Sequence, residues 1–95
     1  MNQAEFEAEL NHQGYLEVVD RRMHGNELNP DHAHEFDARV LVIEGEMTIA
    51  SDAAERTYRA GEAFAIAAGR RHAERSGPQG ARYLAGRRHQ PKAGA

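Results

Sequence analysis

Short apolar segments, separated by polar stretches that contain glycine, recur along most of the chain. Several segments alternate between apolar and polar residues or are rich in β-branched residues, which is typical of β-strands. The segment 38–44, ARVLVIE, is apolar on both faces, as expected for a strand that is covered on both sides. The pattern predicts strands at 15–24, 38–44, 47–52 and 55–59, around Phe64 and Ile66, around His72, and at 81–88. Turns are expected at 25–31, Gly45, Gly69 and 77–80.

About seven short strands at regular spacing predict an all-β sandwich or barrel. In the first strand, Leu16 and Val18 share one face, and His24 has the same parity and is a candidate to face inward. Before this strand, residues 2–13 are acidic and carry interspersed apolar residues, which favours a short helix on the outside of the main body. Asn2 is its expected N-cap and Gly14 its stop signal, although the same alternation also fits a strand.

The chain is expected to form one small domain, because it has only 95 residues. We divide it into an N-terminal helix at 1–13, a β-barrel domain at 14–88 and a flexible tail at 89–95. Hydrophobic residues make up 40% and aromatic residues 6% of the chain, so the core is thin. A core of this kind often gains stability from a partner subunit or a bound metal.

Charge and cysteine content exclude several classes of function. The formal net charge of −3 gives no reason to expect a nucleic-acid partner or an anionic membrane partner. Cysteine is absent, which excludes disulfides, thiolate zinc sites and cysteine nucleophiles and fits a reducing compartment. The acidic N-terminus does not resemble a signal peptide, and no apolar run approaches the roughly 18–20 residues that span a bilayer. We therefore expect a cytoplasmic location.

Two histidines, His32 and His34, stand two residues apart just before the most hydrophobic segment. In a strand they would point to one face, about 7 Å apart along the backbone, so that both imidazoles could reach one ion. His72, which follows the turn at Gly69, is the candidate third ligand. The alternative is that these histidines are ordinary solvated side chains, as we expect for His12 and His89.

The spacing of these histidines and of several glycines resembles the two sequence motifs of the cupin superfamily. The first motif is matched by Gly25, His32, His34 and Gly45, with one extra residue after Gly25, and the second by Gly61, Gly69 and His72, with Ala67 and Ser76 replacing its proline and asparagine. The resemblance covers roughly residues 25–76. It implies a small RmlC-like jelly-roll barrel that holds one divalent transition metal through His32, His34 and His72. It also implies a homodimer.

The chain departs from the family pattern at Ala38, where the first motif has a glutamate. Asp37 has the opposite parity and would reach the metal only through a bulge; otherwise it is solvated or paired with Arg39. Three neutral imidazoles would leave the charge of the ion uncompensated, which strengthens it as a Lewis acid and leaves positions open for other ligands. They suit Zn, Fe, Ni or Cu. The opposite outcome is a weakened, empty site.

Other side chains near the expected site have less specific signals. Glu74 shares the face of His72 and is a weak candidate for a catalytic acid or base, unless it is an exposed residue paired with Arg71 or Arg75. Arg70 is a candidate for binding an anionic substrate. Apolar residues are expected to line a small cavity for an organic ligand, namely Phe36, Phe64, Ile66, Met23 and Met47.

Three functions remain open at this point. The first is a metal-dependent enzyme that acts on a small molecule as an oxygenase, isomerase or lyase. The second is a non-catalytic sensor that binds a small molecule or a metal. The third is a structural dimer with a vestigial metal site, since a fold does not determine a function.

Overall fold

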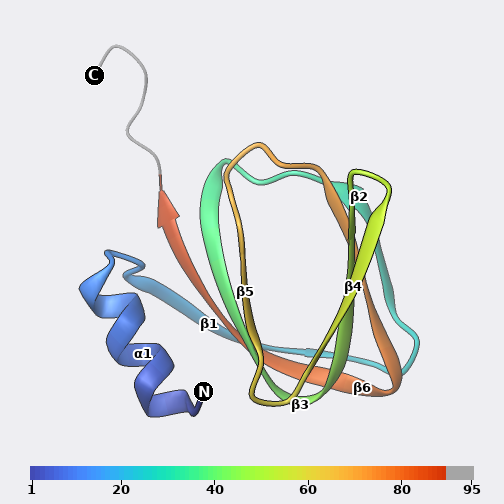
Figure 1. The fold of residues 1–95 in the computed structure, drawn as a ribbon, viewed down its shortest axis with the longest axis horizontal. Coiled ribbons are helices and arrows are strands. Elements are labelled where there is room, and N and C mark those ends of the chain that lie inside the picture. The colour runs from blue at the N-terminus through green and yellow to red at the C-terminus, as the bar shows by residue number, and fades with distance from the viewer. Residues whose placement is uncertain (90–95) are drawn as a thin grey trace.

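The computed structural model describes residues 1–89, which form one short helix followed by six strands (Figure 1). The elements are α1 (Gln3–His12), β1 (Glu17–Met23), β2 (Leu28–His32), β3 (Phe36–Ser51), β4 (Ala54–Arg59), β5 (Ala63–Ile66) and β6 (His72–His89). The prediction of a mainly β-structure with a short N-terminal helix is confirmed. Residues 90–95, most of the predicted tail, lie outside the described part of the chain.

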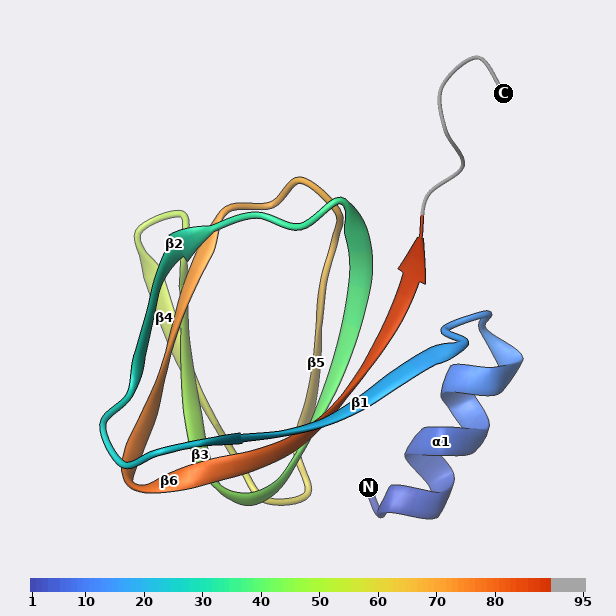
Figure 2. The ribbon, with the colours of Figure 1, turned by 180° about the vertical axis from the view of Figure 1, so that it is seen from behind.

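The two long strands, β3 and β6, organise the sheet by pairing along most of their length. The first part of β6 pairs with β2 and with the second part of β3, which also pairs with β4. The second part of β6 pairs with β1 and with the first part of β3, which also pairs with β5. The result is a jelly-roll-like fold in which the strands are arranged around a common interior (Figures 1 and 2).

The expected barrel is not closed by hydrogen bonds among the described residues. The pairing path runs β1-β6-β3-β4, with β2 and β5 attached to β6 and β3, and it does not return to its start. The strands nevertheless surround one apolar core. Its buried members come from β1, β3, β5 and β6 and are Met23, Val40, Val42, Met47, Ile49, Phe64, Ile66, Ala81 and Ala85.

The predicted turns at Gly45 and 77–80 are wrong, because β3 and β6 run through them as continuous strands. Gly45 has φ +73° and lies against the backbone of Gly80, which has φ +78°. The register between the two strands shifts on both sides of this point. The glycines therefore make a bend in a paired ladder, with bulges, instead of reversing the chain. Part of the predicted turn 25–31 is also extended, as the edge strand β2.

The inward face of β1 is opposite to the one expected from Leu16 and Val18. Leu16 is 75% exposed and Val18 is also exposed, whereas Met23 is buried and Val19 packs partly against the core. His24 follows the strand and is exposed, so it does not face inward. Val19 and Met23 therefore mark the inward face of β1, and Arg21 shares their parity although it is exposed.

Helix α1 packs on the outside of the sheet, as predicted (Figure 1). The side-chain oxygen of Asn2 accepts a hydrogen bond from the backbone N–H of Glu5 at 2.8 Å, which makes Asn2 the N-cap. Phe6 and Leu10 are fully buried in a second apolar cluster with Tyr15, Leu41 and Leu84.

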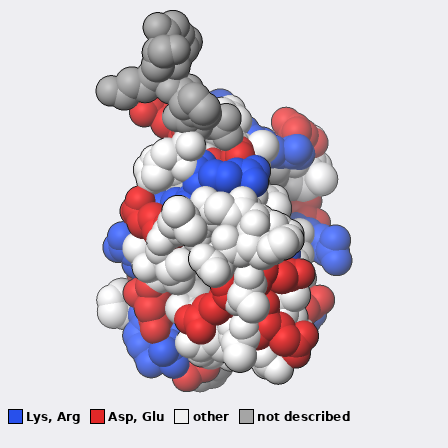
Figure 3. Space-filling model, turned by 90° about the vertical axis from the view of Figure 1, so that its left-hand side faces the viewer, with Lys and Arg blue, Asp and Glu red and all other residues white. Residues whose placement is uncertain are grey.

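Two features of the exterior bear on possible partners. The side of the molecule that carries α1 shows acidic, basic and uncharged side chains interspersed (Figure 3). Within residues 1–89, no helix has the length and apolar character that crossing a membrane requires.

Candidate metal centre

The structure brings together the three histidines that the sequence singled out. His32 ends β2, His34 lies in the segment that leads to β3, and His72 begins β6 directly opposite His32. The backbone carbonyl of His34 accepts a hydrogen bond from the N–H of Gly69 at 2.8 Å, which ties the two segments together. One ring nitrogen of each histidine lies within 4.8 Å of the others. Residues from two distant parts of the chain thus meet at one point.

Backbone carbonyl groups orient two of the three rings. The Nδ1 atom of His32 lies 2.7 Å from the carbonyl oxygen of Pro30, and that of His72 lies 2.9 Å from the carbonyl oxygen of Arg70. A carbonyl only accepts, so each Nδ1 carries the proton and donates it. In the neutral ring, each Nε2 then keeps a free lone pair, which is the arrangement that metal-binding histidines commonly adopt.

Two ring nitrogens in this cluster are buried and have no hydrogen-bond partner among the described residues. They are Nε2 of His72, a residue that is only 1% exposed, and Nδ1 of His34. A buried polar atom without a partner is unfavourable for folding, and such atoms are rare in proteins. A metal ion bound to the lone pair of such a nitrogen would give it a partner, so the residues present fit a bound ion.

His34 is held in its neutral form by its surroundings. Burial lowers its pKa below the ordinary 6.5, and the neighbouring His72 and His32 lower it further. Its ring also stacks on Phe36, with centroids 4.6 Å apart and planes at 11°. A neutral imidazole is the form that binds metals such as Zn, Fe, Ni or Cu.

Glu74 faces the cluster and is not an exposed surface residue. Its Oε1 atom accepts a hydrogen bond from the side chain of Asn29 at 3.1 Å and lies 4.0 Å from Nε2 of His32. Its side chain is 15% exposed. The two arginines that were its alternative partners are engaged elsewhere, Arg71 with Asp31 and Arg75 with Glu55.

Asp37 and Arg70 point to other parts of the structure. Asp37 accepts a hydrogen bond from the backbone N–H of Ala68 at 2.9 Å and pairs with Arg88 at 3.0 Å, while Arg39 pairs with Glu9. It does not belong to the cluster. Arg70 pairs with the exposed Asp52.

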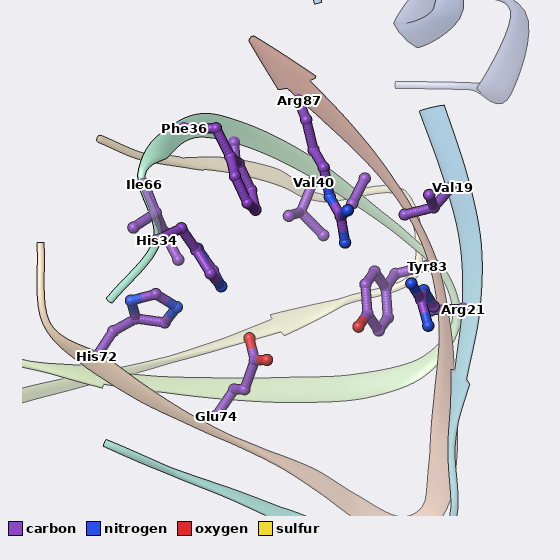
Figure 4. A pocket seen from close by; sticks show the side chains of 12 residues that line it. Val19, Arg21, His34, Phe36, Val40, Ile66, His72, Glu74, Tyr83 and Arg87 are labelled. Atoms are coloured by element: carbon purple, nitrogen blue, oxygen red, sulfur yellow. The ribbon is translucent and has the colours of Figure 1, made fainter. Parts of the chain in front are cut away.

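A cavity of about 260 Å³ opens beside His34 and His72 (Figure 4). Of the residues predicted to line a cavity, Phe36 and Ile66 line this one, Phe64 and Ile66 line a second cavity beside His72, and Met23 and Met47 belong to the packed core. The other lining residues are Val19, Arg21, Ala38, Val40, Glu74, Tyr83, Ala85 and Arg87. Of the polar members, Glu74 was a candidate from the sequence, whereas Arg21 of β1 and Tyr83 and Arg87 of β6 were missed as lining residues. Arg21 has the same parity as Val19 and Met23, which would have placed it on the inward face of the strand. Val18 is equally apolar and suggested the opposite face.

The match to a family model agrees with this geometry. The model described as "Cupin domain" matches residues 20–90, which is most of the chain. The chain belongs to the cupin family. Position 38, where the family motif has glutamate, carries a buried alanine in this cupin. No curated protein matches the chain.

Solved structures with the same fold include several cupins. A Rhizobium leguminosarum protein of unknown function superposes with a TM-score of 0.72 at 19% identity, over 77% of this chain and 69% of that one. A cupin-2 domain protein from Shewanella frigidimarina gives 0.64 at 24% identity, over 75% and 69%. The polyketide cyclase RemF from Streptomyces resistomycificus gives 0.67 at 26% identity, over 79% of this chain and 56% of its own.

Proposed function

We propose that this cupin holds one divalent transition metal between His32, His34 and His72 and binds a small organic molecule in the adjoining cavity. The observation that carries the proposal is the pair of buried, unpartnered ring nitrogens on His34 and His72. An apolar environment makes such atoms unfavourable unless a ligand occupies their lone pairs. The cavity beside them has the mainly apolar lining that is common in small-molecule sites.

The surrounding residues would orient the metal-binding rings and supply a group for proton transfer. The metal would act as a Lewis acid, because three neutral ligands leave its charge uncompensated. The carbonyl groups of Pro30 and Arg70 fix the rings of His32 and His72. The carboxylate of Glu74, which accepts a hydrogen bond from Asn29 and lines the cavity, would accept or return a proton.

An enzyme and a non-catalytic sensor are two forms of this proposal. The similarity to a polyketide cyclase supports an enzyme that acts on an organic substrate. The absence of a carboxylate at Ala38 favours a site that only binds, or a structural dimer with a vestigial site. Release of a bound metabolite unchanged would identify the sensor, and release of a product would identify the enzyme. The homodimer and the cytoplasmic location remain predictions.

Metal analysis of the purified protein tests the proposal. We expect stoichiometric metal in the wild-type protein and its loss in His32→Ala, His34→Ala and His72→Ala, each checked for folding by circular dichroism. His12→Ala is the matched control, since His12 is exposed and lies outside the cluster. Because His72 is fully buried, the half-buried His32 gives the variant that is safest for folding. A wild-type protein that takes up no Zn, Fe, Ni or Cu under any loading condition would overturn the proposal.

A further inference from the structure

One arginine points into the cavity from the strand β1. Arg21 lies between Val19 and Met23 on the inward-facing positions of β1, and its backbone pairs with Tyr83 of β6. Figure 4 shows Arg21 beside Tyr83, across the cavity from His34 and His72. The cavity therefore has a group of histidines at one end and a guanidinium with a phenol at the other.

Arg21 differs from every other arginine of residues 1–89 in having neither an acidic partner nor an aromatic ring beneath it. Arg56 stacks over Tyr58. Each of the rest pairs with a carboxylate, including the second arginine of the cavity, Arg87, which is bound to Glu17 and lies over Phe36. Among the arginines that line this cavity, Arg21 is thus the one whose charge no carboxylate compensates among residues 1–89.

The neighbouring hydroxyl would add a hydrogen bond to the same ligand group. Burial, followed by the charge of Glu74, raises the pKa of Tyr83 above its ordinary value, so the phenol keeps its proton and can donate it. Glu74 lines the same cavity and would repel a ligand with a second negative charge. One free cation, one donor and one nearby carboxylate favour a group with a single negative charge and two acceptor oxygens.

We propose that the ligand of this cavity is a small organic carboxylate, with its carboxylate bound by Arg21 and Tyr83. Its apolar body would lie against Phe36, Val40 and Ile66, and its other end would face the three histidines. This inference rests on the proposed metal and ligand site and names the chemical class that the site selects. Arg21 is its specificity-determining residue.

Calorimetric titration with benzoate, cyclohexanecarboxylate and hexanoate, each compared with its neutral amide, tests this inference. We expect the wild-type protein to bind at least one of these acids about tenfold or more tightly than its amide. Arg21→Gln should bring the acid and the amide within about twofold of each other, since only the charge-assisted contact is lost. Arg22→Gln is the matched control, because Arg22 is the next residue on β1 and is exposed like Arg21, but it does not line the cavity and pairs with Glu44. It should keep the wild-type preference.

Two further measurements separate the possible outcomes. The first is the metal content of the wild-type and Arg21→Gln proteins, which reports on the metal site alone. The second is the comparison of acid with amide, repeated on metal-loaded and on metal-stripped protein. If Arg21→Gln keeps both its metal and the preference for the acid, the inference fails and the proposed function stands. No preference for any acid in the wild-type protein would also overturn the inference. Tighter binding of phenyl phosphate than of benzoate would overturn the choice of a carboxylate.

Discussion

Glu74 and Ala38 line the same cavity from different strands, so the carboxylate nearest the histidines comes from β6 and not from position 38. Glu74 follows His72 by two residues and therefore shares its face. Ala38 is buried in β3 and contributes only a methyl group to the wall. The position at which the cupin motif carries its glutamate thus borders the same cavity but has no polar side chain.

Ala38→Glu should strengthen metal binding. The new carboxylate would place a negative charge close to the ion, and we expect affinity to rise about tenfold or more in a chelator competition titration. The metal-free variant should melt at a lower temperature than the wild-type protein, because a carboxylate is then buried without a partner. Added metal should restore the melting temperature.

Ala38→Gln is the control for this substitution, since it adds similar volume without charge. Its metal affinity should stay near that of the wild-type protein. An equal rise in affinity in both variants would show that charge at position 38 is not the cause. An unchanged affinity in Ala38→Glu would place position 38 out of reach of the ion.

His72 is distant in sequence from the other two histidines, and the resemblance to the second cupin motif is what singled it out as their partner. The pair His32 and His34 could be predicted because its information is local, since two residues at spacing two share a face of an extended chain. The helix was predictable for the same reason, since Asn2 and Gly14 mark its ends within a few residues. In these cases, neighbours in sequence decide the structure.

The role of Gly45 and the inward face of β1 depend on distant partners and could not be predicted. A glycine with positive φ serves a turn and a bulge equally well, and only the approach of Gly80 makes Gly45 a bend in a continuous strand. Val18 and Val19 are equally apolar, so pairing of β1 with β6 decides which one faces the core. Arg21 was missed because of that ambiguity.

Gly45→Ala should destabilise the protein strongly. A Cβ atom at this position would overlap the backbone carbonyl of Gly80, and the positive φ adds strain. We expect the free energy of unfolding to fall by about 3 kcal/mol or more in urea denaturation. Gly69→Ala is the matched control, because its φ is also positive, at +81°, while its Cβ would meet open space. It should lose only about 1–2 kcal/mol. Equal losses in the two variants would contradict this account of the bend.

Leu10→Ala should destabilise the fold without removing the metal site. Leu10 is 1% exposed and contacts β6 at Gly86, so its truncation leaves a cavity and should cost about 2–5 kcal/mol. Because α1 lies outside the sheet, metal content of the folded variant should match that of the wild-type protein. Glu7→Ala, at an exposed position of the same helix, should change stability by less than about 0.5 kcal/mol. Loss of metal in folded Leu10→Ala would show that the helix supports the site.

The lowered pKa of His34 predicts a pH dependence for the metal-free protein. Burial keeps this imidazole neutral at a pH where the unfolded chain already binds a proton, so acid favours the unfolded chain. The contribution of His34 to stability is therefore complete above pH 6.5 and is lost as the pH falls below that value. Urea denaturation between pH 7 and pH 5 should show stability falling with acid, and His34→Gln should reduce the slope.

Two substitutions should move the His34 titration in opposite directions. The carboxylate of Glu74 raises the pKa of His34 and the charge of Arg87 lowers it. Glu74→Gln should therefore lower the midpoint observed by NMR in metal-free protein, and Arg87→Gln should raise it. The wild-type midpoint itself should lie below 6.5, because burial is the largest cause of the shift. A wild-type midpoint at or above 6.5 would contradict the burial of the ring. Shifts of the same sign in both variants would mean that repacking, and not charge, governs His34.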